Sequence, residues 1–192
     1  MLYPLPAALI TVSDPKLGDN VFTAAWVGTV CTNPPMLSVS VRPERYSYPI
    51  MEKTGVFAVN LTTEKLAYAT DYCGVVSGRD VDKFQRAGLT KIPAETIAVP
   101  LIDESPVNIE CRVVEKKILG SHTMFLAEVL CVHAAEDYFD DSGRFCLEKA
   151  NPIVYSHGSY FGLGKKLGKF GYSVSGKKKG PRKKSSYRKD KK

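Results

Sequence analysis

The segment from Asn20 to Pro49 constrains the fold of this chain more than any other. Val21 to Thr32 carries no charge and consists mainly of small, β-branched and aromatic residues, which favour a half-buried strand. Asn33-Pro34-Pro35 then predicts a turn, because proline has no N–H to donate to a β-ladder. Met36 to Val41 alternates apolar residues with serines, which is the period of a second strand. The sequence therefore predicts an antiparallel pair of strands at the centre of the fold.

A polar segment follows this pair of strands. Arg42-Pro43-Glu44-Arg45-Tyr46-Ser47 supplies guanidinium and hydroxyl donors just before a short helix predicted over residues 48–53. Arg45 can bind a phosphate through two parallel hydrogen bonds, and Ser47 can donate its hydroxyl near the start of that helix. The main-chain groups of the strands and these donors together suit a flat, polar ligand that carries a phosphate.

The rest of the chain predicts more strands and a few short helices. Strands are expected at residues 7–13, 56–61, 107–118, 123–134 and 153–155, and helices at residues 63–72 and 81–87. Asp80 is the predicted N-cap of the second helix, and residues 90–106 are expected to be irregular. Nothing repeats, and helices do not alternate regularly with strands, so a doubly wound α/β fold is disfavoured.

Four segments, in this order, resemble the flavin reductase-like family. They are TAAWVGTVCTNPP at residues 23–35, RPERYSY at 42–48, FAVNL at 57–61 and SGRDVDKF at 77–84. The family consists of FMN-binding split β-barrels and includes flavoredoxins and the reductase components of two-component monooxygenases. The resemblance implies a mainly β, antiparallel Greek-key split barrel over residues 1–174, and a homodimer with the flavin at or near its interface.

The same resemblance implies which residues meet the cofactor. The flavin-lining positions are Trp26, Val27, Thr29, Val30 and Cys31; the phosphate segment contains Arg45, Tyr46 and Ser47; a second donor cluster contains Ser77, Gly78 and Lys83. His157 falls where family members place residues close to the nicotinamide or the partner subunit. Each of these has a simpler reading as well: Trp26 fits a core or interface position, lone cations are usually surface charges, and a lone histidine is more often structural.

Composition limits the classes of function. The formal charge of +7 arises in Lys177 to Lys192, which has ten basic residues and one acidic residue and leaves the rest of the chain at −2. Residues 175–192 are therefore predicted to be a basic, disordered tail. No apolar run is long enough to cross a bilayer and no signal peptide is recognisable, so a cytoplasmic protein that does not enter the membrane is expected.

Cysteine and histidine usage points away from disulfides and metals. The five cysteines are scattered and form no CxxC motif, which is typical of small buried residues in a reducing compartment. His122, Cys131 and His133 lack the spacing of a metal site. No metal is expected.

The predicted activity is that of a flavin reductase, which binds FMN non-covalently and passes reducing equivalents to it from NAD(P)H. The hydride moves directly to the flavin, so no catalytic acid or base is required, and NAD(P)H is expected to bind transiently because no Rossmann motif is present. A flavoredoxin-like electron carrier is the close alternative. Either would have a redox partner protein or a monooxygenase component as its partner. Nucleic-acid binding through the basic tail is the distant alternative.

Overall fold

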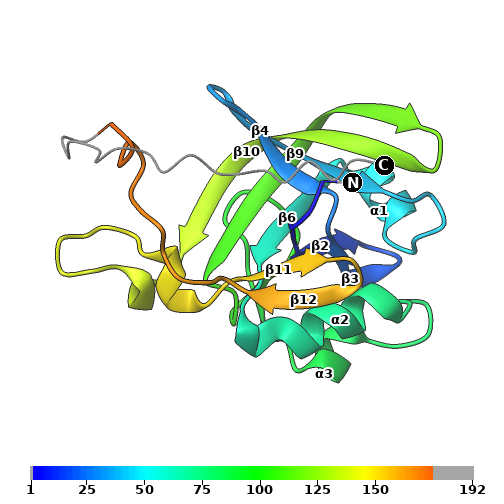
Figure 1. The fold of residues 1–192 in the computed structure, drawn as a ribbon. Helices are drawn as coiled ribbons and strands as arrows, with labels where there is room; N and C mark the ends of the chain where they lie inside the picture. The colour runs from blue at the N-terminus through cyan, green and yellow to red at the C-terminus, as the bar shows by residue number, and fades with distance from the viewer. Residues whose placement is uncertain (1, 175–192) are drawn as a thin grey trace, which may run out of the picture.

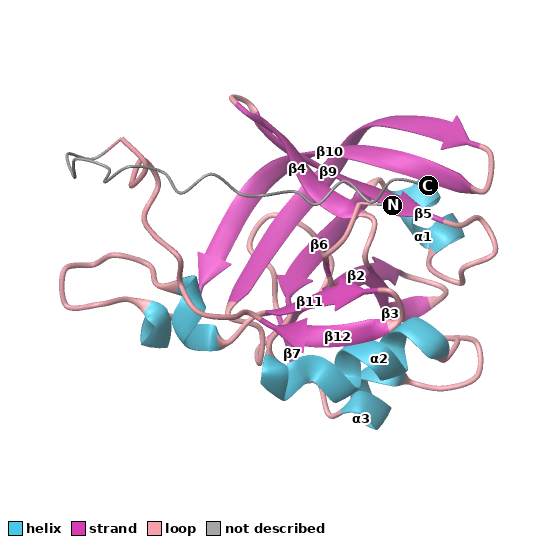
Figure 2. Cartoon of the chain, in the orientation of Figure 1, coloured by secondary structure: helices cyan, strands magenta, loops and turns pink. Residues whose placement is uncertain are grey.

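The computed structural model describes residues 2–174, which are organised around one seven-stranded sheet (Figures 1 and 2). In spatial order its strands are β3 (Gly18–Ala24), β2 (Ala8–Asp14), β6 (Val56–Leu61), β9 (Val107–Leu119), β10 (His122–Ala134), β5 (Pro35–Val41) and β4 (Val27–Thr32). All neighbouring pairs are antiparallel. The strands β3 and β4 are consecutive in the chain but occupy opposite edges of the sheet.

Shorter elements complete the fold. A three-stranded sheet contains β1 (Leu5–Pro6), β11 (Ile153–Ser156) and β12 (Ser159–Gly162), and a two-stranded one contains β7 (Lys91–Ile92) and β8 (Leu101–Ile102). The α-helices are α1 (Tyr48–Thr54), α2 (Ala67–Val75) and α3 (Lys83–Ala87), with 3₁₀ turns at Glu64–Leu66, Glu136–Tyr138 and Leu147–Ala150. Within residues 2–174 no helix is long and apolar enough to cross a membrane.

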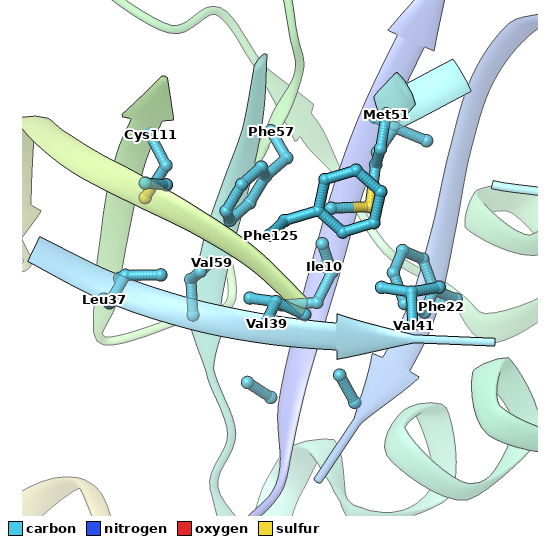
Figure 3. Packing of buried hydrophobic residues seen from close by; sticks show 14 of the residues in the cluster. Ile10, Phe22, Leu37, Val39, Val41, Met51, Phe57, Val59, Cys111 and Phe125 are labelled. Carbon is cyan, nitrogen blue, oxygen red and sulfur yellow. The ribbon is translucent and has the colours of Figure 1, made fainter. Parts of the chain in front are cut away.

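The curved main sheet encloses an apolar core (Figure 3). Leu37, Val39 and Val41 of β5 point into it, as the alternation with serine predicts, and the fully buried rings of Phe57 and Phe125 lie between the strands. Complete burial of one such side chain stabilises the fold by about 1.5–3 kcal/mol. A slip of one residue in β5 would turn its three apolar side chains to solvent, so the core fixes the register of this strand.

Two helices cover the other face of the β2–β3 edge (Figure 1). Leu9 and Val21 point away from the main core and pack against Leu66, Ala69 and Cys73 at the start of and along α2. These last three residues are three and four positions apart in the sequence, which places them on one face of a helix. The helix α2 is consequently fixed beside β3, and this position matters for the site below.

The prediction of one continuous strand over Val21 to Thr32 is wrong. The chain leaves β3 after Ala24 and enters β4 at Val27, and only β4 pairs with β5. Ala25 and Trp26 carry the chain from one edge of the sheet to the other, where the N–H of Ser40 donates to the Trp26 carbonyl at 2.9 Å. Both halves favour strand conformation, so local propensity does not show that the pairing partner changes between them.

Smaller corrections concern helix ends and short strands. Asp82, not Asp80, caps α3, because its Oδ1 accepts from the Gln85 N–H at 3.2 Å. The helix predicted over residues 63–72 begins as a 3₁₀ turn and continues to Val75. Residues 90–106 contain the β7–β8 pair, and β12 was not predicted. The predicted basic tail, residues 175–192, lies outside the described residues.

Candidate functional site

Two adjoining hollows lie along the crossing between β3 and β4. One has a volume of about 440 Å³ and the other about 500 Å³, and both are lined by Ala25, Trp26 and Ser40. The polar and charged residues of the first hollow include Arg42, Arg45, Asp71, His122, Tyr155 and Tyr160. The second is lined chiefly by apolar and small residues, namely Leu2, Tyr3, Leu5, Val27, Gly28, Thr29, Val30 and Ser38. Volumes in this range are typical of cofactor sites.

The wall shared by the two hollows consists of small residues and one indole. At Gly28 no atom lies within 4 Å of the position that a Cβ would take, so the surface of β4 is open there. The side chain of Trp26 is 51% exposed and stacks on the ring of His122, with 5.9 Å between ring centroids and 14° between planes. This stack brings the tip of the β9–β10 hairpin to the mouth of the first hollow.

The strand β4 is the last strand of its sheet, so one side of its backbone pairs with no other strand of the described chain. An edge strand presents a row of free N–H and C=O groups. A heterocycle that lies against β4 can therefore satisfy its ring nitrogens and oxygens with main-chain groups, as a buried polar ring requires.

Guanidinium groups provide the positive charge of the first hollow. Arg45 Nη1 donates to the Gly74 carbonyl at 3.0 Å, which holds the side chain at the C-terminal turn of α2. A guanidinium has five N–H donors, so this bond leaves others for an anion. Arg42 lines the same hollow and has its Nε 3.7 Å from Glu44.

The first hollow is also lined by a carboxylate, Asp71, and a phenol, Tyr160. Burial, together with the charge of the Asp71 carboxylate and a hydrogen bond to it, raises the pKa of Tyr160 to about 12. The phenol is therefore protonated at neutral pH and acts as a donor. Its ring lies 5.6 Å from that of Tyr155 on the preceding strand.

A group of buried polar residues supports the loop behind Arg45. The Asn20 amide donates to the Ser47 hydroxyl at 2.6 Å, and both side chains are buried. Gly78 packs against this pair so tightly that a Cβ would lie 2.3 Å from Asn20 Oδ1. The ring of Tyr46 lies beneath the Arg79 guanidinium, 5.9 Å away. The close approach of two chain segments therefore explains the glycine in the SGRDVDKF segment.

Lys83 is buried beside the same helix end. It is 4% exposed and donates from Nζ to the Cys73 carbonyl at 2.9 Å. Burial, aided by the charge of Arg45, lowers the pKa of Lys83 to about 8. Lys83 and Arg45 thus bind consecutive carbonyls at the C-terminus of α2, where positive charge complements the helix dipole.

The structure brings some of the predicted site residues together and separates others. Trp26 and Arg45 line the first hollow, and Val27, Thr29 and Val30 line the second. Seven residues line neither hollow: Cys31, Tyr46, Ser47, Ser77, Gly78, Lys83 and His157. His157 has a positive φ of 48° and packs its ring 4.2 Å from that of Tyr3. A direct role in binding stays a prediction for all of these residues.

Sequence reasoning missed the residues that non-local elements contribute. Asp71 comes from α2, His122 from the β9–β10 hairpin, and Tyr155 and Tyr160 from β11 and β12. None of them belongs to a motif, and only the tertiary structure brings them to the hollow. Arg42 lies in the polar segment that the sequence does single out.

Known proteins share this fold. A family model described as "Flavin reductase like domain" matches residues 1–164. The structure superposes on the flavoredoxin of Desulfovibrio vulgaris (Miyazaki F) with a TM-score of 0.84 and 29% identity, covering 91% of this chain and 95% of that one. For the flavoredoxin from Methanosarcina acetivorans the values are 0.82 and 31%, covering 91% and 94%. The predicted Greek-key split barrel is confirmed.

Uncharacterized archaeal proteins are also similar in sequence. One from Archaeoglobus fulgidus is 34% identical over 139 residues, covering 72% of this chain and 77% of its own. Another, from Aeropyrum pernix, is 33% identical over 156 residues, or 81% of this chain, and the match spans 58% of the length of that relative.

Proposed function

The chain belongs to the flavin reductase-like domain family, and we propose that it binds FMN non-covalently and passes reducing equivalents from NAD(P)H to that flavin. The observation that carries the proposal is the pair of joined hollows, which has an open edge strand on one side and Arg45 on the other. This combination matches the two chemical ends of FMN, a polar tricycle and a phosphate.

The two hollows suit different parts of the ligand. The isoalloxazine would lie against the small residues and free main-chain groups of β4, with Trp26 beside it. The phosphate would take the remaining donors of Arg45 in the first hollow, and Arg42 adds a second positive charge there. Tyr160, whose O–H is already hydrogen-bonded to Asp71, would accept a hydrogen bond from a hydroxyl of the ribityl chain through its phenol oxygen. The charge-assisted contacts between the phosphate and the two arginines would contribute about 1.5–3 kcal/mol each.

The bound flavin would supply the redox chemistry by accepting a hydride from the nicotinamide. The protein has to orient the two rings and exclude water from between them. The stacked Trp26 and His122 stand at the mouth of the first hollow, where a transiently bound nicotinamide would approach. None of these steps needs a side chain to take up or release a proton.

A homodimer forms part of this proposal. Large apolar side chains are exposed near the hollows and on the β9–β10 hairpin, among them Val30 at 52% and Ile118 at 74%. Apolar exposure of this kind is typical of interaction surfaces. A second copy of the chain would cover the open side of the hollows. Light scattering of the purified protein should give twice the chain mass.

Anaerobic reduction tests the proposed activity. With one equivalent of FMN bound, the flavin absorbance should be bleached by NADH or NADPH within seconds to minutes. A flavoredoxin-like electron carrier is the second candidate, and the 29% and 31% identity with two flavoredoxins favours it. For a carrier, the flavin would stay oxidised with either nicotinamide and be reduced only by a low-potential donor. A redox partner protein or a monooxygenase component would then receive the electrons.

A further inference from the structure

A second cluster of chemically active side chains lies far from the flavin hollows. Cys131 and His133 are two residues apart on β10, so they share one face of the sheet. Glu95 reaches them from the segment between β7 and β8. A carboxylate oxygen of Glu95, the Cys131 sulfur and a ring nitrogen of His133 all lie within 4.8 Å of one another.

One buried carboxylate holds this cluster in place. Glu110 is fully buried and lies directly opposite Cys131 in the β9–β10 register. Its Oε1 is 2.6 Å from His133 Nε2 and accepts from the Glu95 N–H at 2.7 Å. Its Oε2 accepts from the Thr96 N–H and hydroxyl. Burial alone would raise the pKa of Glu110, but these hydrogen bonds outweigh it and lower the pKa to about 2.

We propose that Glu95, Cys131 and His133 bind a zinc ion, with water as the fourth ligand. Thiolate, imidazole and carboxylate are the ligands that zinc takes in proteins. In zinc sites a ligating histidine usually donates its other ring N–H to a carboxylate, which fixes the orientation and the tautomer of the ring. Glu110 makes this contact with His133.

The geometry needs only a small adjustment to accept the ion. Neighbouring ligand atoms of a tetrahedral zinc lie roughly 3.3–3.8 Å apart. Cys131 Sγ and Glu95 Oε2 are already at 3.7 Å, and the exposed Glu95 side chain is free to rotate. Burial and the nearby carboxylates raise the pKa of the Cys131 thiol, and a divalent cation offsets that negative field and displaces the thiol proton.

Spacing along the chain did not indicate this site, because Glu95 is distant in sequence from the other two ligands. His122, which the sequence places near them, lies at the opposite end of the 13-residue strand β10 and lines the first hollow. That separation is roughly 30 Å at the rise of a β-strand. The zinc would therefore tie the β7–β8 segment to β10 without touching the flavin.

Cobalt substitution tests the proposal on the full chain. After treatment with a chelator, Co²⁺ should bind one to one and produce visible bands of a tetrahedral site and a thiolate-to-cobalt charge-transfer band, read as a difference against the same sample before addition. Zn²⁺ should abolish both. C131S should remove the charge-transfer band, and H133A should weaken Co²⁺ binding at least tenfold.

Two further variants test whether these side chains form a metal site or lie close together by chance. C31S removes the other half-buried cysteine, on β4, and should bind Co²⁺ like the wild type. E110Q should weaken binding about 10- to 100-fold, as does the loss of a carboxylate that orients a metal-binding histidine. The proposal is overturned if the wild type gives no charge-transfer band at saturating Co²⁺, or if C131S keeps the band. Should E110Q fail to fold, the comparison of C131S with C31S decides.

Discussion

Arg45 donates from Nη1 to the carbonyl oxygen of Gly74 at 3.0 Å, so the loop after β5 is joined to the last turn of α2 at the rim of the first hollow. Lys83 makes the equivalent bond to the neighbouring Cys73 carbonyl from inside the protein. Arg45 thus lines the hollow, whereas Lys83 is buried and lines neither hollow. The two cations that the sequence singles out therefore have different surroundings.

The exposed cation should bind the phosphate. We expect R45A to weaken FMN binding about 10- to 100-fold, the equivalent of a charge-assisted hydrogen bond of about 1.5–3 kcal/mol. Riboflavin lacks the phosphate, so its affinity should change little. R79A is the matched control, because Arg79 lies over Tyr46 and lines neither hollow. Isothermal titration of both ligands makes the comparison, and equal losses for FMN and riboflavin would remove Arg45 from the phosphate site.

The buried cation should show itself in the pH dependence of stability. The pKa of Lys83 is about 8 in the folded protein against an ordinary lysine value of 10.5, so between these pH values the unfolded chain holds the extra proton. The free energy of unfolding must then rise with pH between about 8 and 10.5 because of Lys83. Below pH 8 Lys83 adds no pH dependence, since it is protonated in both states.

Other groups titrate in the same range, such as Cys73, because burial raises its pKa to about 11. The variant K83M separates the contribution of Lys83 from theirs. Urea denaturation of wild type and K83M at several pH values from 7 to about 10.5 should show the wild type gaining, relative to K83M, up to about 3 kcal/mol. A difference that stays constant with pH would mean that Lys83 is solvated and fully charged.

The close packing at Gly78 gives a prediction about stability alone. In G78A the new Cβ would lie 2.3 Å from Asn20 Oδ1 and 2.9 Å from the Tyr46 ring, and Asn20 is held by its hydrogen bond to Ser47. We expect a loss of about 1–3 kcal/mol, which is typical of overpacking. G28A is the control, because nothing lies within 4 Å of its Cβ position. Thermal unfolding of the two variants compares them, and equal melting temperatures would contradict the packing described here.

Local patterns in the sequence predicted those parts of the fold in which local structure and burial agree. The alternation in β5 and the short helix expected over residues 48–53, found as α1, are examples. The break at Ala25 and Trp26 was missed, because a change of pairing partner leaves no local signal when both flanking strands are β-prone. The same reason explains why Asp71 and Tyr160 were missed: they reach the hollow only through tertiary structure.

Ser47 and Lys83 show a second limit of sequence reasoning. Their residue types suit phosphate binding, but the sequence does not show that Ser47 accepts from the Asn20 amide or that Lys83 donates to the Cys73 carbonyl. Sequence alone gives the chemical type of a donor and not the partner that already satisfies it. Burial was the missing information, since both side chains are less than 5% exposed.

The central claim is that FMN occupies the two hollows on either side of Trp26. Trp26 is the single tryptophan of the chain and lines both hollows, so its fluorescence reports on this site alone. Titration of the flavin-free protein with FMN should quench the tryptophan emission saturably, at one flavin per chain and in parallel with the change in flavin fluorescence. If ultrafiltration shows that FMN binds tightly but the tryptophan emission does not change, the cofactor lies elsewhere and the account is contradicted.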